Sequence, residues 1–290
     1  MALAYRPANA AEIPRPTDGE FARFRDLIHE QTGIHLKDHK RDLLMARLGR
    51  HIGNLGFHSF SEYYDYVARD ASGDALRAFI NRITTNKTSF FREPHHFEFL
   101  GTRLIPELRR RGRRELSLWS AGCSTGEEPY TIAMVIQEAL GMHHGWDARI
   151  LASDIDTDVL AHAREGIYPM EALNGVSAER RRSFFQRGYG RFEGQAQVRP
   201  ALRRMVEFRR INFKDPEWGV SGLFDAIFCR NVIIYFDRAL QEQIIGRLTA
   251  RLKPDGYYFC GHSENLFWLG DLLLPVGPTV YRLNHGGGKQ

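Results

Sequence analysis

Two adjacent carboxylates, Glu127 and Glu128, follow a loop of small residues and form the clearest chemical signal in the sequence. The surrounding segment, 118–130, reads LWSAGCSTGEEPY, a pattern typical of a strand, a tight loop and the first turn of a helix. Gly122 and Gly126 allow the backbone to turn sharply and a ligand to approach the main chain. Their spacing is not that of a dinucleotide-binding loop or a P-loop, and the P-loop lysine is missing.

The position of the two acids indicates the charge of the ligand. A helix N-terminus stabilises carboxylates in its first turn, but these carboxylates would repel a phosphate. The ligand is therefore expected to be neutral or cationic, and S-adenosylmethionine meets this demand through its sulfonium and amino groups. The alternative is an ordinary capped turn between a strand and a helix.

A third acid, Asp154, closes the predicted strand 149–155 and lies 28 residues after Gly126. An acid at this place accepts hydrogen bonds from ribose hydroxyls in dinucleotide-binding folds. The alternative role is the N-cap of the following helix, for which Asp156 is the rival candidate.

Amide and aromatic side chains stand at two later strand ends. Asn212 could bind an adenine edge, and Phe213 could flank the ring. Asn231 and Tyr235, in FCRNVIIYFD, place an amide and a phenol near the same cleft. This segment differs from the Asn-Pro-Pro-Tyr box of amino-group methylases, so we expect the methyl acceptor to be something other than nitrogen.

The segment 83–100, ITTNKTSFFREPHHFEFL, joins two regions of different pattern and is rich in hydrogen-bond donors. Asn86, Thr88 and Arg92 lie between aromatic residues in it. The alternative to a functional role is a capped helix start with core phenylalanines.

The periodicity predicts an all-α N-terminal domain followed by an α/β domain. After a lead-in over 1–17, helices are expected at 18–32, from an Asp38 N-cap onward, at 59–70 with a Ser59–Glu62 capping box, and at 74–84. Strands are then expected at 116–119, 149–155, 206–213, 224–231, 256–262 and 279–283, and helices at 128–141, 156–165 and 237–252. This alternation indicates a mostly parallel sheet, which a β-hairpin insertion at 172–205 interrupts.

Composition narrows the class of protein. The chain has 290 residues, 43% of them hydrophobic, and three cysteines without metal-binding spacing, so a reducing cytoplasmic setting without a metal is expected. The net charge of +5 predicts an acidic partner, without choosing among nucleic acid, a membrane surface and a protein.

Five segments, taken together and in order, resemble the CheR family of chemotaxis receptor methyltransferases. They are TTNKTSFFREPHHF, LWSAGCSTGEEPYTIAM, ASDIDTDVLAHAREGIY, FDAIFCRNVIIYFD and LKPDGYYFCGHSEN. The resemblance implies a class I S-adenosylmethionine-dependent methyltransferase (Rossmann-like) fold over 86–290, behind a helical domain over 18–85. It further implies methyl transfer to glutamate side chains of chemoreceptors, with S-adenosylhomocysteine as the product.

The resemblance also implies roles for individual residues. Cofactor contacts would come from Asn86, Thr88, Arg92, Glu128, Asp154, Asn212, Phe213, Arg230 and Asn231. Arg92 and Tyr235 would orient the receptor carboxylate. The partners would be the cytoplasmic helical domains of chemoreceptors, with the membrane reached only through them and no nucleic acid bound.

Two surfaces are candidates for receptor contact. On a helical wheel Lys40, Arg47 and Arg50 share one basic flank, which would suit acidic receptor helices; the alternative is a merely solvated face. The insertion resembles the subdomain that in some family members adds a strand to a C-terminal receptor pentapeptide, with Gly188, Gly190 and Gly194 at the matching places.

Two rival functions remain at this stage. A nucleic-acid methyltransferase would explain the basic charge, but no aromatic-rich basic segment suited to stacking bases is present. A module that binds the cofactor without chemistry would not require Arg92, Asn231 or Tyr235.

Overall fold

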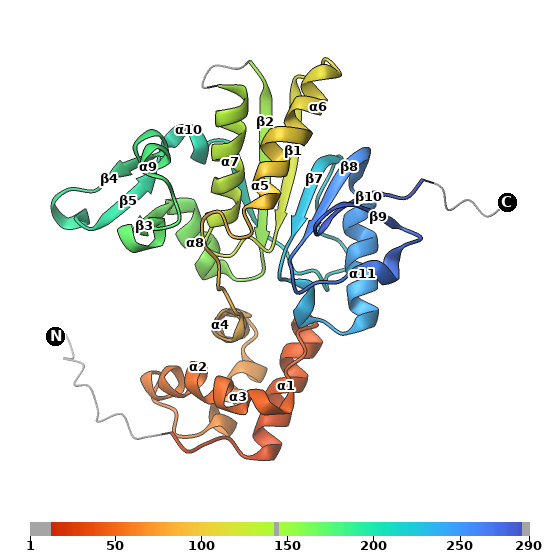
Figure 1. Cartoon of the computed structure of the whole chain (residues 1–290). Helices are drawn as coiled ribbons and strands as arrows, with labels where there is room; N and C mark the ends of the chain where they lie inside the picture. Colours follow the sequence, from red (N-terminus) through yellow and green to blue (C-terminus); the bar gives the residue numbers. More distant parts are fainter. Residues whose placement is uncertain (1–12, 142–144, 286–290) are drawn as a thin grey trace. The chain divides into compact units, whose positions relative to one another are not determined.

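A computed structural model describes residues 13–141 and 145–285 (Figure 1). The chain divides into two compact units. The first comprises Met1–Thr85 with Tyr235–Asp237, and the second Asn86–Ile234 with Arg238–Gln290.

Over its described residues the first unit is helical. Its elements are α1 (Asp18–Thr32), the 3-10 helix η1 (Asp38–Lys40), α2 (Arg41–Asn54), α3 (Phe60–Arg69) and α4 (Asp74–Ile83). A further 3-10 helix, η5 (Ile233–Tyr235), ends in this unit.

Local hydrogen bonds explain the bounds of α1, which match the predicted range 18–32. The Thr17 hydroxyl accepts from the Glu20 N–H at 3.2 Å, and the Glu20 carboxylate accepts from the Thr17 N–H at 2.9 Å. This is a complete capping box. The helix ends at Gly33, whose φ of 76° is readily reached only without a side chain.

Two predicted caps need correction. Asp38 does not cap the second helix, because η1 begins at Asp38 itself and the carboxylate instead accepts from Arg25 Nη1 at 3.2 Å. Ser59 caps α3 by accepting from the Glu62 N–H at 3.2 Å, but Glu62 accepts from the His58 N–H and not from Ser59. Only half of the predicted capping box therefore forms.

The core of the first unit is aromatic. Phe24 is fully buried, and its ring lies 6.0 Å from Phe60, 6.1 Å from Tyr63 and 5.4 Å from Phe79. The apolar side chains of α2 are buried as well, namely Leu44, Leu48 and Ile52. Rings of this size remove 150–250 Å² each from water, so a short helical unit gains a substantial core.

A seven-stranded sheet forms the centre of the second unit, in the order β6-β2-β1-β7-β8-β10-β9. The strands are β1 (Glu115–Ala121), β2 (Asp147–Asp154), β6 (Val206–Arg210), β7 (Phe224–Cys229), β8 (Leu252–Cys260), β9 (Leu273–Gly277) and β10 (Val280–Leu283). The first five are parallel neighbours, and β10 pairs antiparallel with both β8 and β9. The mostly parallel sheet is therefore confirmed.

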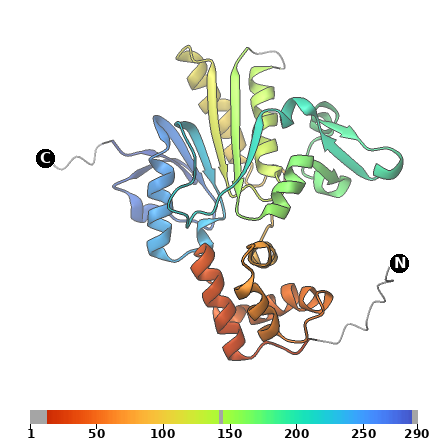
Figure 2. The same ribbon diagram turned by 180° about the vertical axis from the view of Figure 1, so that it is seen from behind.

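Helices cover both faces of this sheet (Figures 1 and 2). On one face lie α5 (His95–Phe99), the π-helix η2 (Leu100–Leu104), α6 (Ile105–Arg110) and α7 (Glu127–Leu140). They share a large apolar core with Leu118, Phe228 and Phe259. The helix α8 (Thr157–Glu165) packs beside β2 and β6, and α11 (Arg238–Thr249) packs against β8.

The presence of most helices and strands was predicted correctly, but the residues at which they begin and end were predicted less well. The strand expected at 206–213 ends at Arg210, and the one expected at 256–262 begins at Leu252. The strand β9 was not predicted, and the helical run α5–α6 was foreseen only in the alternative for 83–100, a helix start with core phenylalanines.

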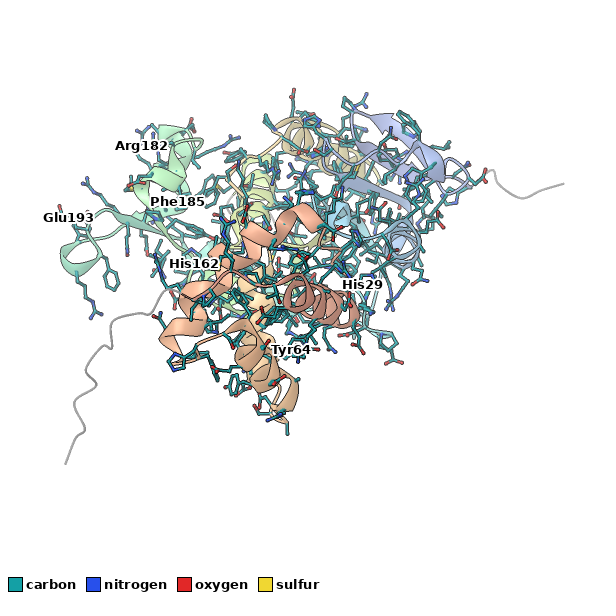
Figure 3. All side chains as sticks on the ribbon, turned by 90° about the horizontal axis from the view of Figure 1, so that it is seen from below. His29, Tyr64, His162, Arg182, Phe185 and Glu193 are labelled. Atoms are coloured by element: carbon teal, nitrogen blue, oxygen red, sulfur yellow. The ribbon has the colours of Figure 1, made fainter. Side chains whose placement is uncertain are left out.

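The hairpin predicted within 172–205 is formed by β4 and β5, but it belongs to a separate three-stranded antiparallel sheet in the order β3-β5-β4, the β-subdomain, whose first strand precedes the predicted range. Its elements are β3 (Ile167–Pro169), η3 (Met170–Leu173), α9 (Ala178–Phe184), β4 (Phe185–Arg187), η4 (Gly190–Phe192), β5 (Gln195–Val198) and α10 (Pro200–Arg203). It projects from the large sheet, with Phe185 at its base and Glu193 toward its tip (Figures 1 and 3).

Arg47 has a structural contact that the helical wheel could not show. Its guanidinium donates to the carbonyl of Ile83, to the carbonyl of Thr84 at 2.8 Å and to the Thr85 hydroxyl at 3.0 Å. The side chain is half-buried, whereas Lys40 and Arg50 are exposed. Arg47 thus donates to carbonyls at the C-terminus of α4, where the last backbone C=O groups have no partner within the helix.

We expect Arg47→Ala to destabilise the first unit by about 1–3 kcal/mol, because it removes the charged donor that binds partly buried carbonyls at the end of α4. Arg50→Ala, on the same helix and exposed, should change stability by no more than about 0.5 kcal/mol. Urea unfolding followed by circular dichroism measures both. Equal midpoints for the two variants would contradict the capping role.

Candidate functional site

The loop that follows β1 has an unusual backbone. Gly122, Ser124 and Gly126 all have positive φ, at 93°, 49° and 96°. The N–H groups of Gly122 and Cys123 both donate to the carbonyl of Ser153, at 2.7 and 2.8 Å. These bonds hold the small-residue loop, 122–126, against the end of β2.

Both glycines of this loop are required by close packing. A Cβ on Gly122 would lie 2.3 Å from Val232 Cγ2, and one on Gly126 would lie 2.8 Å from the Cβ of Ala163. The loop therefore rests against the segment after β7 on one side and against α8 on the other.

Asp154 is bound to this loop and does not cap α8. Its carboxylate accepts from the Ser124 N–H at 2.8 Å and from the Asp156 N–H at 3.0 Å. Burial raises the pKa of Asp154 to about 6, and these hydrogen bonds oppose the rise. Asp156 is the N-cap instead, accepting from the N–H groups of Asp158 and Val159.

Asn86 reaches the same loop from the linker. Its side-chain Nδ2 donates to Asp156 Oδ2 at 2.7 Å, and its backbone carbonyl accepts from the Ser124 hydroxyl at 3.0 Å. Asn86 thereby positions the acids and the loop. Thr88 lies partly exposed in the same linker.

Glu128 and Arg230 form a buried ion pair at the start of α7. Arg230 Nη1 lies 2.9 Å from Glu128 Oε2, and Glu128 Oε1 accepts from the Ser120 hydroxyl at 2.7 Å. Burial raises the pKa of Glu128, and Arg230 opposes the rise. Burial also raises the pKa of the neighbouring Glu127.

Arg230 also binds the linker, and its side chain is only 2% exposed. Its guanidinium donates to the carbonyl of Arg92 and lies 3.3 Å from Glu93 Oε2. The residues on either side of Arg92, Phe91 and Glu93, both have a φ of 56°. Such a conformation costs roughly 1–3 kcal/mol per bulky residue and persists only where the surroundings hold it.

Arg92 itself is partly exposed. Its Nη1 donates to the carbonyl of Lys87 at 2.8 Å, which curls the side chain back over the linker. The N–H of the preceding residue, Phe91, donates to the Thr131 hydroxyl at 3.2 Å and ties the linker to α7.

Asn231 follows β7 with a φ of 58°, a conformation that asparagine tolerates better than most residues. Its Oδ1 is buried and has no hydrogen-bond partner among the described residues. A buried acceptor without a partner is costly, so this atom is suited to receive a donor from a ligand.

Asn212 and Phe213 follow the end of β6, beside Asp154. The Ile211 N–H donates to the backbone carbonyl of Asp154 at 2.9 Å, and this bond holds the segment after β6 beside the end of β2. Asn212 Oδ1 accepts from the Lys214 N–H at 3.1 Å, and the Phe213 ring packs edge-on against Trp218. Both residues are buried.

The predicted cofactor residues at or beside the carboxyl ends of β1, β2, β6 and β7 are Glu128, Asp154, Asn212, Phe213, Arg230 and Asn231, and Asn86 and the Arg92 carbonyl reach this cluster from the linker. The predicted tether glycines Gly188, Gly190 and Gly194 lie apart from it in the β-subdomain. Tyr235 is described within the first unit, where its carbonyl accepts from the His35 N–H at 2.8 Å. Glu264 was not predicted as a site residue. It lies in the segment GHSEN, but its partner Asn231 is 33 residues away in the sequence, and no short-range pattern indicates a contact over such a separation.

Groups that could suggest other chemistries are structural here. His96 is buried with its Nε2 2.7 Å from the Thr279 hydroxyl, and burial lowers its pKa to about 2, so the ring is neutral. The three cysteines are buried free thiols. Over 13–141 and 145–285 no group of three or more His, Cys, Asp or Glu side chains is arranged to hold a metal.

The residues at these strand ends fit S-adenosylmethionine. Burial raises the pKa values of Glu127, Glu128 and Asp154, and a bound cation would oppose this rise by stabilising their carboxylate forms. The Asn231 Oδ1 offers an unused acceptor to it. Among the described residues no helix is long and apolar enough to cross a bilayer.

Two family profiles match the sequence. The one described as "CheR methyltransferase, all-alpha domain" matches residues 19–84, and "CheR methyltransferase, SAM binding domain" matches residues 86–279. Together they cover both units.

Curated relatives are similar over nearly their whole length. A protein named "Chemotaxis protein methyltransferase 2" from Pseudomonas aeruginosa is 44% identical over 265 residues, covering 91% of this chain and 93% of that protein. "Chemotaxis protein methyltransferase" from Salmonella typhimurium is 45% identical, with 92% and 91% covered, and its counterpart from Escherichia coli K12 is 44% identical, with 92% of each covered.

The affinity for S-adenosylmethionine should depend on the ionisation of Asp154. Because burial raises the pKa of this carboxyl to about 6, it is ionised above that pH and accepts hydroxyl donors there. Lowering the pH through 6 should protonate it and weaken binding about tenfold. Calorimetry between about pH 8 and about pH 5 measures the effect.

Asp154→Asn should bind weakly and lose this pH dependence, whereas Asp147→Asn, at the exposed start of the same strand, should retain it. An unchanged pH dependence in Asp154→Asn would assign it to another group.

Proposed function

The chain belongs to the CheR methyltransferase family, and from this membership we propose how its residues perform the S-adenosylmethionine-dependent methylation of chemoreceptors. The residue roles rest mainly on the grouping of two partly buried acids, Glu128 and Asp154, with Asn231 beside the carboxyl ends of the adjacent strands β2, β1 and β7. Its chemistry suits a cationic methyl donor.

We propose a glutamate carboxylate of the receptor as the acceptor. It is ionised at pH 7, so it needs neither a general base nor a metal to attack. The bound cofactor supplies a methyl group on a positively charged sulfur. One carboxylate oxygen forms the new bond to carbon as the carbon–sulfur bond breaks and its electron pair stays on sulfur, which gives a methyl ester and S-adenosylhomocysteine.

The positive charge of the sulfonium and the negative charge of the carboxylate cancel in this reaction. Alignment of the reactants and their desolvation must therefore supply the rate acceleration. Asp154 would hold the ribose hydroxyls, and Asn212 with Phe213 the adenine. The methionyl end would meet Glu128 and Arg230, whose Nε is buried without a hydrogen-bond partner among the described residues. Its amino group suits Glu128, and its carboxylate suits Arg230.

Arg92 would orient the receptor carboxylate from the linker. Among the residues that the structure describes, only its Nη1 is engaged, to a neighbouring carbonyl, so the guanidinium can be redirected toward a ligand at small cost. The strained residues Phe91 and Glu93 and the Arg230 contact hold its backbone. A firm ion pair would make the carboxylate less nucleophilic, so orientation is the proposed role. Tyr235 would assist in it.

The receptor would first meet the basic flank of the helical unit. Lys40 and Arg50 are exposed and free to approach acidic receptor helices. Arg47 is engaged with the end of α4, so we assign it a supporting role on this surface. Because the receptor glutamates lie on cytoplasmic helices, we place the reaction in the cytoplasm.

A second contact is proposed at the β-subdomain, where a C-terminal receptor pentapeptide would add a strand to β4. Within the described part of the chain this strand pairs with β5 alone and forms an edge of the small sheet, and the adjacent Tyr189 is 81% exposed. The glycines there also serve the local turn. A Cβ on Gly188 would lie 2.1 Å from the Phe192 carbonyl oxygen, and Gly190 and Gly194 have positive φ.

Arg92→Ala should lower kcat for methyl incorporation into a receptor cytoplasmic fragment by about 100-fold, because an orienting donor is lost. Arg103→Ala, an exposed arginine of η2, serves as the matched control and should retain kcat. Single-turnover methyl transfer with saturating cofactor separates the chemical step from binding. A near-normal kcat for Arg92→Ala would remove this residue from the reaction.

Reversing both exposed charges, Lys40→Glu with Arg50→Glu, should raise KM for the receptor fragment about tenfold at low salt and leave cofactor affinity unchanged. Receptor fragments with and without the terminal five residues test the tether in the same assay. If the pentapeptide binds the β-subdomain, the longer fragment should have a lower KM with both the wild-type protein and the double variant. An unchanged KM for the Lys40→Glu, Arg50→Glu double variant would indicate that the basic flank is merely solvated and does not contact the receptor.

A further inference from the structure

The carboxylate of Glu264 accepts hydrogen bonds from four backbone N–H groups in two different loops. Its Oε2 accepts from Gly261 at 2.5 Å and from Asn231 at 2.9 Å. Its Oε1 accepts from Val232 at 2.8 Å and from Ile233 at 3.0 Å. One side chain thus joins the segment after β8 to the segment after β7.

This arrangement uses the full capacity of the carboxylate. Two carboxylate oxygens offer about four lone-pair sites, and each is taken by an amide. Three of the donors are consecutive, residues 231–233, and successive amides of this kind form a concave anion-binding site. Glu264 is only 3% exposed, and burial raises its pKa while the four hydrogen bonds oppose the rise.

The four bonds fix the place of the Asn231 amide. Glu264 holds the N–H of Asn231, whose φ is 58° and which would relax without a partner. It also holds Gly261, against which the Asn231 side chain lies so closely that a Cβ there would be 2.3 Å from Nδ2. Both the backbone that carries the amide and the surface on which it rests therefore depend on one carboxylate.

The same segment presses on the small-residue loop after β1. Val232, whose N–H binds Glu264, has its Cγ2 only 2.3 Å from the position of a Cβ on Gly122. The loop to which Asp154 is bound therefore supports residues 231–233 from the other side and limits their displacement.

We propose that Glu264 is a positioning residue for cofactor binding, which acts by presenting the unpartnered Oδ1 of Asn231 to the ligand. The inference rests on the proposed function. Glu264 touches no reacting group itself. It acts through Asn231, so its loss should matter only while the Asn231 amide is present.

A double-mutant cycle on S-adenosylmethionine affinity tests this dependence. Glu264→Gln replaces one oxygen by an NH₂ group that would face N–H donors, and should raise the dissociation constant at least about tenfold. Asn231→Gly keeps the positive φ but removes the amide, and should weaken binding similarly. The double variant should bind within about threefold of Asn231→Gly.

Fold-changes that multiply in the double variant, or an unchanged dissociation constant in Glu264→Gln, would overturn the proposal. Glu107→Gln is the matched control, because this half-buried carboxylate accepts from Tyr257 and Arg282 and contacts none of the residues 231–233. It should bind the cofactor as the wild type does. Thermal unfolding of each variant separates loss of binding from loss of folding.

If Glu264→Gln does not fold, Glu264→Asp replaces it in the cycle, since the shorter side chain keeps the charge but cannot reach all four amides. Wild-type affinity in Glu264→Asp would then overturn the proposal. Absence of binding by the wild-type protein would contradict the proposed function instead, so the two failures are distinguishable.

Discussion

A buried guanidinium, that of Arg230, is the contact on which the rest of the site depends. It joins the end of β7 to the first turn of α7 through Glu128, and to the linker through Glu93 and the Arg92 carbonyl. Removing one partner of a buried ion pair typically costs about 3–5 kcal/mol, because the other charge is left uncompensated. One side chain therefore holds both the linker around Arg92, with its strained neighbours, and Glu128 in the first turn of α7.

Backbone geometry and charge serve the same end in this site. Positive φ values at Gly122, Ser124 and Gly126 bring the main chain close to a ligand, and Asp154 is fastened to that loop. Burial raises the pKa values of the surrounding acids, and a bound cation would oppose that rise by stabilising their carboxylate forms. A methyl donor with a positive sulfur matches this environment better than a phosphate-bearing ligand.

The sequence predicted what short-range patterns determine. The bounds of α1 follow from the Thr17 capping box and Gly33, and the parallel sheet follows from alternating strands and helices. It did not predict what tertiary contacts determine. Arg47 reads as part of a basic flank, yet binds carbonyls 36 and 37 residues away, and Glu264 meets amides 31 to 33 residues away.

The most direct test of the central claim is the chemical nature of the methylated product. The wild-type protein would be incubated with methyl-labelled S-adenosylmethionine and, in parallel, with a chemoreceptor cytoplasmic fragment or with RNA. The account predicts label on the receptor fragment that mild alkali releases as methanol, as a carboxylate ester requires. Alkali-stable label, or label transferred to RNA, would contradict it.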